Sequence, residues 1–502
     1  MSKGSDPVIS LGRRSKSALL WGAVEIFLRQ GVGFIFSIFL ARLLAPEDFG
    51  VIGMLSIFIA VAGVFVDSGF SSALIQRKDP TARELSSVFF FNVLMASVAA
   101  GVLVGLAPWI ADFFRMPILK PLTWLMAFNL FLGSLRSIHV TLLTKRLDFR
   151  KQMRATVLAS VISGAVGVFL AWRGWGVWSL AWQTVVATLV STVVLWWICA
   201  WRPTLTFSFA ALRSLFRFGS FMFLSGLLES AYSRLHVAVI GRLYSARDLG
   251  LYTRADATQQ LPVTTISGLL GRVAFPVFVA AADDQVVLRR AIRKALTVIT
   301  LLNAPMMLGL LAVSRPLVMC LFGEKWLPCV PYLQVFCLSG VFYPWHVINL
   351  QVIKSVGRSD LFFRLEVIKK VLGLTALLVA APLGVLAMVW SRPIVSLLCY
   401  FVNAYYTGRL ACYPAGRQIR DMGSALVAAS VMLALVWPIT TLGWTPAILT
   451  LGIQVMAGVT IFSGLCLLCR IESAGYVLAE AKEFWRRRSR PATIVPAGTK
   501  NA

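Results

Sequence analysis

Long apolar blocks run through the whole chain, and they constrain its fold more than any other feature. Each block has about 20–28 residues, the length that an α-helix needs to cross the hydrocarbon of a bilayer. Only 14% of the residues are charged and 58% are hydrophobic, which is too little charge for a water-facing surface of this size. The alternating segments of a membrane-spanning β-barrel are not visible. We therefore predict an all-α integral membrane protein.

The blocks predict about fourteen transmembrane helices. We expect them at 18–44, 49–75, 86–111, 121–143, 154–173, 176–200, 216–241, 249–281, 293–321, 331–354, 363–381, 383–406, 423–442 and 446–469. The span 249–281 contains Pro262 and Pro276, so we expect it to be bent. The first span is too long for the apolar core of a signal peptide, and we read it as a membrane anchor.

Lysine and arginine alternate between the two sides of the predicted membrane. Of the 48 Lys and Arg residues, 34 fall on the side that holds the N-terminus and 8 on the opposite side. Because cytoplasmic loops carry the excess of basic residues, we predict a bacterial inner-membrane protein with both termini in the cytoplasm. The basic clusters, such as 145–154, 289–294 and 486–490, then reflect topology and contact with anionic lipid. The net charge of +27 does not indicate nucleic acid.

An internal repeat divides the chain. The segment 41–50 recurs at 241–250, an offset of 200 residues, with Arg, Leu, Asp and Gly in equivalent places. Six spans lie in each period, so both halves enter the membrane in the same direction, which predicts two pseudo-symmetric six-helix lobes with a site at their interface. Asp48 and Asp248 should each cap the helix that follows. The expected parts are an N-tail (1–16), an N-lobe (17–201, helices 1–6), a C-lobe (202–410, helices 7–12), helices 13–14 (411–470) and a basic tail (471–502).

Ionisable side chains inside the spans are the candidate functional residues, because burying a charge in a bilayer is costly. The candidate cavity cations, which would bind substrate, are Arg29, Arg136, Arg234, Arg254, Arg272 and Arg392. The candidate coupling carboxylates are Glu25, Asp67, Glu229 and Asp256. A guanidinium holds phosphate oxygens in a fork, so the arginines suit an anionic cargo. A carboxylate near mid-membrane, as Glu229 should be, can link cargo release to an ion gradient by taking up a proton.

Structural alternatives stay open for these charges. Glu25 and Arg29 lie four residues apart on one helix face and can neutralise each other. The other arginines can reach the interface or bind backbone carbonyls.

The sequence offers little for a catalytic, metal or cofactor site. It contains no G-x-x-x-x-G-K-[ST] nucleotide loop and no long external loop for an enzyme site. His139, His236 and His346 are too dispersed to bind one metal, and the C-x-x-C of Cys466 and Cys469 has no partner pair. We predict no enzyme activity, no metal and no cofactor.

A series of short motifs carries a family resemblance between about residues 17 and 410. The motifs are Leu40–Gly50, Asp67–Phe70 with Ala73–Arg77, Lys145–Phe149, Gly174–Leu180, Gly241–Leu243 with Asp248–Tyr252, Leu321–Trp326 with Pro328, and Val356–Arg358. In their order and spacing they resemble the Wzx-type polysaccharide flippases, in particular those like the colanic acid exporter. This family belongs to the multidrug/oligosaccharidyl-lipid/polysaccharide (MOP) superfamily.

The resemblance implies a two-lobed transporter that works by alternating access, coupled to an ion. Its implied cargo is an undecaprenyl-pyrophosphate-linked oligosaccharide repeat unit, flipped from the cytoplasmic to the periplasmic leaflet for exopolysaccharide, capsule or lipopolysaccharide O-antigen. Implied partners are membrane lipids and the polymerase and chain-length or export proteins of the same pathway. Arg29 and Arg254 fall on helices that supply cavity cations in related lipid flippases.

Four alternatives are weighed against this reading. A peptidoglycan-precursor (lipid II-type) flippase shares the superfamily, and a drug or cation antiporter would favour acidic clusters at mid-membrane. A membrane polysaccharide polymerase would need a large external loop, which is absent from the predicted topology. A purely structural membrane scaffold fits poorly with charges buried on many helices.

Overall fold

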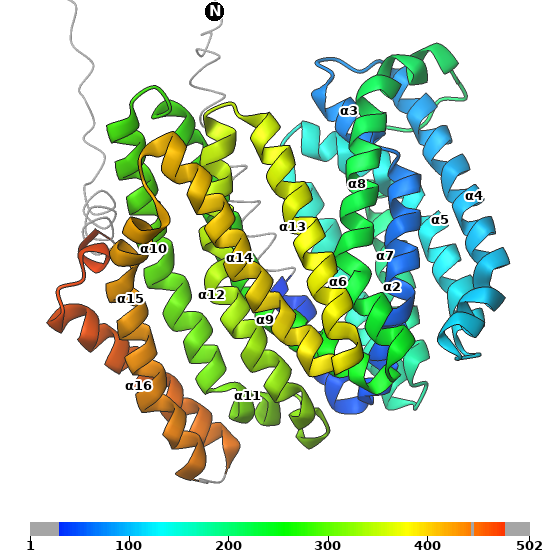
Figure 1. Cartoon of the computed structure of the whole chain (residues 1–502). Helices are drawn as coiled ribbons and strands as arrows, with labels where there is room; N and C mark the ends of the chain where they lie inside the picture. Colours follow the sequence, from blue (N-terminus) through cyan, green and yellow to red (C-terminus); the bar gives the residue numbers. More distant parts are fainter. Residues whose placement is uncertain (1–29, 443–445, 477–502) are drawn as a thin grey trace, which may run out of the picture. The chain divides into compact units, whose positions relative to one another are not determined.

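The chain is almost entirely helical in a computed structural model that describes residues 30–442 and 446–476. The side chains of 217–218, 265–273, 359 and 441–442 also lie outside the description. Among the described residues only α-helices and short 3-10 helices occur, joined by turns (Figure 1). The all-helical prediction is therefore confirmed.

Ten helices of the described chain are long and apolar enough to cross a membrane. They are α2 (Pro46–Asp67), α4 (Ala82–Phe114), α5 (Leu119–Lys145), α6 (Phe149–Trp172), α7 (Val177–Ile198), α10 (Gln285–Ala312), α12 (Val330–Ser355, counted with the preceding turn), α14 (Val385–Ala411), α15 (Ala415–Val436, counted with the following turn) and α16 (Ala447–Leu468). The chain is therefore a multi-pass membrane protein.

The remaining predicted spans also coincide with helices. α8 (Phe209–Leu243) qualifies as a span only as a bent pair of helices. The helical segment Gln30–Leu43 is shorter, and α9 (Ala246–Ala280) and α13 (Ser359–Ala380) are not among the ten. The total of fourteen spans stays a prediction. α9 runs as one helix through both of its prolines.

The helices pack into two units. The first runs to Arg254 and includes Leu321–Cys329, and the second consists of Ala255–Cys320 and the chain from Val330 onward. This division places α8 with the first unit, although the predicted C-lobe starts at residue 202. Packing in one conformation does not test which helices move together, so the lobe boundaries stay a prediction.

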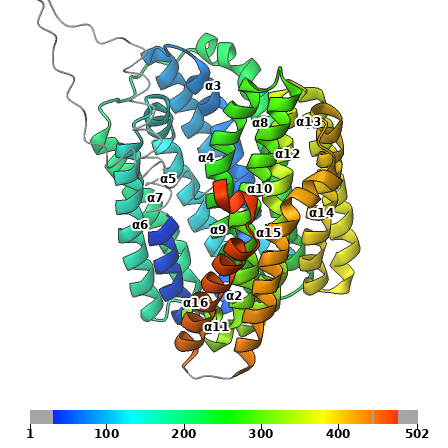
Figure 2. The same cartoon turned by 90° about the vertical axis from the view of Figure 1, so that its left-hand side faces the viewer.

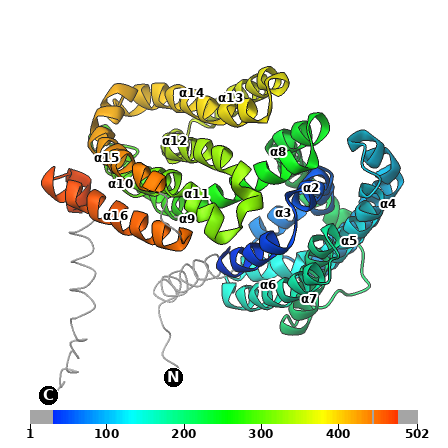
Figure 3. The same ribbon diagram turned by 90° about the horizontal axis from the view of Figure 1, so that it is seen from below.

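In the first unit, α6 packs against α7, α4 against α5, and α2 against α8 (Figure 1). Short α3 (Phe70–Gln76) adds Phe70 and Leu74 to a buried cluster with Val88, Phe89 and Ile138. In the second unit, α10 packs against α12 and α15, and α14 against α12 and α13. Figure 2 shows α16 beside α15, and Figure 3 shows α13 beside α14.

The two repeated turns pack against each other within the first unit. A Cβ atom added at Gly50 would lie 1.7 Å from the carbonyl oxygen of Ala246, and one added at Gly250 would lie 1.8 Å from that of Pro46. Pro46 and Ala246 are themselves equivalent positions of the repeat. The contact is therefore reciprocal, and it explains why each copy of the turn carries glycine: only hydrogen fits where two backbones approach so closely.

The aspartates of both turns cap their helices as predicted. Asp48 accepts a hydrogen bond from the Ala45 N–H at 3.0 Å. Asp248 accepts from the Ser245 N–H at 3.3 Å and from the Ser245 hydroxyl at 2.6 Å. Each carboxylate lies in the first turn of its helix, where it also opposes the helix dipole.

Candidate functional site

A buried arginine surrounded by aromatic rings marks a candidate site in the first unit. Arg254, on α9, is 6% exposed, and its guanidinium carbon lies 4.4 Å from the ring centre of Phe49, 5.0 Å from that of Phe322 and 5.1 Å from that of Trp326. Its Nη1 donates to the Ser37 hydroxyl at 2.5 Å. Ring faces attract a cation without neutralising it, so these contacts hold a positive charge inside a membrane protein.

Trp326 lies on a short 3-10 helix, η1 (Glu324–Cys329), that is bonded to the end of the segment Gln30–Leu43. Trp326 is fully buried, and its Nε1 donates to the Ala41 carbonyl at 2.8 Å. Lys325 Nζ donates to the Arg42 carbonyl at 2.8 Å. Carbonyls in the last turn of a helix have no partner within that helix. The motif residues Leu321–Trp326 therefore both cap a helix and place two rings around Arg254.

An ion pair in the second unit forms a second candidate site. Arg392 Nη1 lies 3.0 Å from Asp256 Oδ1, and the two side chains are 33% and 22% exposed. Gln260 Nε2 donates to the other carboxylate oxygen at 2.8 Å, and the guanidinium of Arg392 also lies 5.2 Å from the ring centre of Phe336. Both members of this pair were predicted as separate functional residues, and the structure brings them together.

The pair can be opened in two chemical ways. A proton on the Asp256 carboxylate removes the attraction to Arg392. A phosphate oxygen can instead take the place of the carboxylate, because a guanidinium binds both anions with the same fork. Partial exposure leaves the pair open to either event.

Two of the other predicted residues bond to serine hydroxyl groups. Arg136 on α5 donates to the Ser191 hydroxyl on α7 at 2.9 Å. Asp67 accepts a hydrogen bond from the Ser71 hydroxyl, where α2 ends and α3 begins. Glu229 and Arg234 on α8 have exposed side chains. Glu25 and Arg29 lie outside the described residues, as does the side chain of Arg272.

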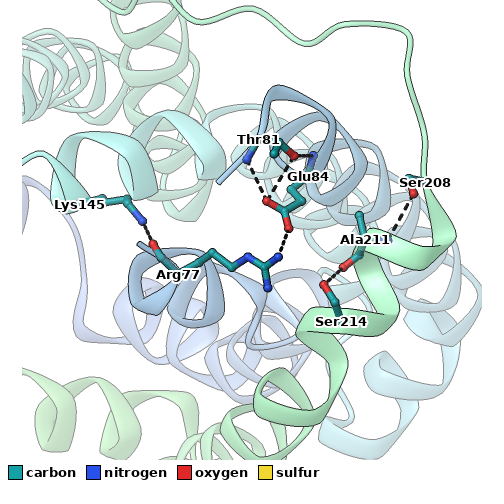
Figure 4. Close-up of polar contacts among 7 residues, drawn as sticks. All are labelled: Arg77, Thr81, Glu84, Lys145, Ser208, Ala211 and Ser214. Atoms are coloured by element: carbon teal, nitrogen blue, oxygen red, sulfur yellow. Dashed lines mark hydrogen bonds and ion pairs between the residues drawn. The ribbon is translucent and has the colours of Figure 1, made fainter. Parts of the chain in front are cut away.

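Some basic loop residues turn out to cap helices. Arg77 Nη2 lies 2.8 Å from Glu84 Oε1, and Glu84 also accepts from the Thr81 N–H at 2.8 Å (Figure 4). Lys145 donates to the carbonyls of Leu74 and Arg77 at the end of α3. Glu84 is a buried acid that the sequence analysis missed, although Thr81-x-x-Glu84 is a readable capping-box pattern.

The three histidines lie beside aromatic rings, and of the C-x-x-C only Cys466 is packed, since Cys469 is exposed. His139 lies against Trp196 and Trp201, and Cys466 packs beside Leu301 and Ile471. Among the described residues, no group of three His, Cys, Asp or Glu side chains could hold a metal ion.

The fold is that of a class of membrane transporters. A solved structure of the lipid II flippase MurJ in an inward closed conformation matches with a TM-score of 0.74, covering 90% of this chain and 99% of that chain at 15% identity. An inward-facing multidrug resistance MATE family transporter of the MOP superfamily matches with a TM-score of 0.61, covering 79% and 100% at 16% identity. At such identities the likeness concerns the fold alone.

Sequence comparison gives the family within that class. A family model described as polysaccharide biosynthesis protein matches residues 39–331, more than half of the chain. The chain belongs to this polysaccharide biosynthesis protein family.

Its relatives have names from bacterial polysaccharide pathways. The lipopolysaccharide biosynthesis protein WzxC of Escherichia coli is 27% identical over 78% of this chain and 82% of that protein. The succinoglycan biosynthesis transport protein ExoT of Rhizobium meliloti is 28% identical over 74% and 75%. The teichuronic acid biosynthesis protein TuaB of Bacillus subtilis is 27% identical over 68% and 72%. The resemblance to Wzx-type polysaccharide flippases is confirmed, and the fold is shared with a transporter of the MOP superfamily.

Proposed function

We propose that this protein flips undecaprenyl-pyrophosphate-linked oligosaccharide repeat units from the cytoplasmic to the periplasmic leaflet of the bacterial inner membrane. The units would serve exopolysaccharide, capsule or lipopolysaccharide O-antigen biosynthesis. The observation that carries the proposal is the family match over residues 39–331. Relatives named for lipopolysaccharide biosynthesis and for succinoglycan biosynthesis transport support a cargo from polysaccharide biosynthesis. The protein acts as a transporter and not as an enzyme.

Charges on and beside α9 would handle the pyrophosphate. Arg392 is partly exposed and paired with Asp256, so it can exchange a carboxylate for a phosphate. Arg254 is closed in by rings in this conformation, so it would meet the cargo only after Phe49, Phe322 and Trp326 move apart. Such a change in access to a buried cation fits alternating access. Arg29, Arg136, Arg234 and Arg272 remain proposed cavity cations.

Coupling to an ion gradient would run through a carboxylate. The Asp256 carboxylate and the cargo phosphate would compete for Arg392, so a change in the charge of Asp256 would change the affinity for the cargo. Glu229, Glu25 and Asp67 remain proposed coupling carboxylates. Coupling of this kind needs no nucleotide.

The test is to delete the gene and follow the lipid-linked glycan. We expect full-length repeat units on undecaprenyl pyrophosphate to accumulate on the cytoplasmic face, inaccessible to periplasmic glycosidases or ligases. Surface polymer should disappear, and a plasmid copy should restore it. If single repeat units still reach the periplasm in the deletion strain, the protein is not the flippase for that glycan.

The same strains separate the alternative functions. A polymerase mutant would export single repeat units without joining them. A lipid II-type flippase would rescue a strain depleted of its peptidoglycan-precursor flippase, which we do not expect of this protein.

A further inference from the structure

A strongly basic hollow lies in the second unit, where α10 and α15 begin. Its two adjoining parts have volumes of about 490 and 370 Å³, and Arg290, Arg293 and Asp421 border both. Six cations line the hollow, namely Arg289, Arg290, Arg293, Lys294, Arg417 and Arg420. Two carboxylates, Asp421 and Glu472, line it as well, so the described lining residues have an excess of four positive charges.

Both carboxylates are already engaged by one arginine. Arg293 Nε lies 3.1 Å from Asp421 Oδ2, and Arg293 Nη2 lies 2.8 Å from Glu472 Oε2. The Tyr413 hydroxyl donates to Asp421 at 2.8 Å, and burial together with this hydrogen bond raises the pKa of Tyr413, so the hydroxyl keeps its proton. Together these three side chains carry one net negative charge, against the five other cations of the lining.

Among the described residues, no acid lies beside the other arginines. Within the described part of the chain, no carboxylate lies within 4.0 Å of Arg289, Arg290, Arg417 or Arg420. Arg417 and Arg420 are three residues apart on α15, so they project from the same side of that helix. Four guanidinium groups around one hollow repel each other unless an anion lies between them.

The start of α15 is held in place beneath these arginines. Gln418 and Asn349 exchange two side-chain hydrogen bonds, at 3.1 and 3.0 Å, and both residues are fully buried. Gln418 also donates to the Tyr413 carbonyl at 2.9 Å. Because Gln418 lies between Arg417 and Arg420 in the sequence, this anchor fixes the backbone that carries both cations.

A separate apolar groove lies further along α10 and α15, beside α16. Its volume is about 470 Å³, and its lining includes Leu302, Pro305 and Met306 of α10, Met432 of α15, and Val455 and Phe462 of α16. Arg293 and Leu302 are nine residues apart on α10, which corresponds to about 14 Å along a helix. A basic hollow matches the phosphate headgroup of a phospholipid, and an apolar groove further along the same helices matches its acyl chains.

We propose that the hollow binds the phosphate headgroup of an anionic phospholipid of the surrounding membrane, with its acyl chains along the apolar groove. The excess of four charges suits a headgroup with two phosphates better than one with a single phosphate. The charge pattern predicts that this end of the helices faces the cytoplasm, where basic pockets between helices meet anionic headgroups. The site is separate from the charges of α9.

Native mass spectrometry of the full-length protein in detergent tests the proposal. The probes are cardiolipin with two phosphates, phosphatidylglycerol with one, net-neutral phosphatidylethanolamine, and inorganic phosphate or diphosphate alone. We expect cardiolipin to bind about tenfold more tightly than phosphatidylglycerol, a difference of about 1.4 kcal/mol. The double variant Arg417→Gln, Arg420→Gln should lower that affinity about tenfold or more.

Matched variants control for general surface charge. Arg146→Gln with Arg154→Gln removes two exposed arginines on the same predicted side, and it should leave binding unchanged. Arg417→Lys with Arg420→Lys keeps the charge and should retain part of the affinity. If the Gln variant is unstable, Arg289→Gln with Arg290→Gln makes the same test from α10.

Three results would overturn the proposal. One is unchanged cardiolipin affinity in the site variants, and another is an equal loss in the Arg146 and Arg154 control. The third is inorganic phosphate or diphosphate binding as tightly as cardiolipin, which would assign the hollow to a soluble anion. Because the readout is lipid binding without cargo, it does not depend on whether the chain flips a sugar lipid.

Discussion

At the scale of single residues, Asp256 and Arg392 allow binding and coupling to be tested separately. Arg392→Ala removes the fork that would hold phosphate, so we expect polymer export to fall about tenfold or more while protein abundance is kept. Arg392→Lys keeps a charge but only a point charge, so its export should be intermediate. Loss of the protein from the membrane in the Ala variant would mean that the pair of Asp256 and Arg392 stabilises the fold and does not bind cargo.

Asp256→Asn tests the coupling half of the pair. Asparagine resembles the protonated carboxyl, so the variant should hold Arg392 in its released state. We expect export to become insensitive to dissipation of the proton gradient, and its maximal rate to fall because cargo release is slowed. The measurement is export with and without an ionophore, compared with the native protein. Unchanged sensitivity of export to the ionophore would mean that Asp256 is not the coupling carboxylate.

Arg254 and its rings make a second residue-scale prediction. Arg254→Gln keeps a polar side chain of similar length but removes the charge, and we expect export to be lost with abundance retained. Trp326→Phe keeps a ring but removes the donor to Ala41, which should cost about 1 kcal/mol of stability and leave most export. Thermal unfolding and polymer output measure the two effects. Full export in Arg254→Gln would remove Arg254 from the proposed site.

Local chemistry at this scale could be predicted, and long-range pairing could not. The caps made by Asp48 and Asp248 depend on residues three positions away, so the sequence pattern was sufficient. Asp256 and Arg392 were identified because charges inside spans are costly, but their pairing across 136 residues depends on how α9 and α14 pack. The rings around Arg254 were missed for the same reason.

At the scale of helices, the contact between α2 and α9 can be tested with a single methyl group. Alanine at Gly50 would meet a backbone carbonyl at 1.7 Å, which cannot move as a side chain can. We expect Gly50→Ala and Gly250→Ala each to destabilise the purified protein by about 1–3 kcal/mol, as overpacking does.

Gly63→Ala is the matched control for this contact. Gly63 lies on the same helix α2, and nothing lies within 4 Å of the position that an added methyl group would take, so alanine should be neutral or stabilising by about 0.5–1 kcal/mol. Thermal unfolding of the three variants decides the question. Equal stabilities of Gly50→Ala and Gly63→Ala would mean that the close approach is not maintained in the membrane.

Helix positions followed from hydropathy, but their interruptions did not. The predicted span 49–75 is divided into α2 and α3, with Ser68 and Gly69 at positive φ angles of 46° and 73°. A Cβ at Gly69 would lie 2.2 Å from the Gly219 carbonyl oxygen of α8, so the break fits a contact with a distant helix. Averages of hydropathy over a span cannot detect such a requirement.

At the scale of the whole molecule, orientation is the main prediction. We expect both termini and the loop before Arg417 to face the cytoplasm, since the basic residues concentrate there. Fusions of a reporter that is active only in the cytoplasm should fluoresce at both ends, and a periplasmic phosphatase fused there should be inactive. A periplasmic C-terminus would contradict the even number of spans.

The fold class was predictable from composition and periodicity, because the bilayer permits few architectures. The family followed from the order of short motifs between Leu40 and Arg358. The grouping of helices into transport lobes could not be derived in this way, since it depends on which contacts persist when the protein changes conformation.

The reciprocal contact between the repeated turns also has an evolutionary meaning. Gly50 faces the carbonyl of Ala246, and Gly250 faces the carbonyl of Pro46. Each copy of the turn therefore contributes one glycine and one backbone carbonyl to the contact. This is the pattern of a two-fold symmetric interface between identical subunits. In a dimer of half-length chains a single glycine codon would serve both contacts. After fusion of the halves each glycine must be maintained by selection on its own, and a loss in one half can no longer be mirrored in the other.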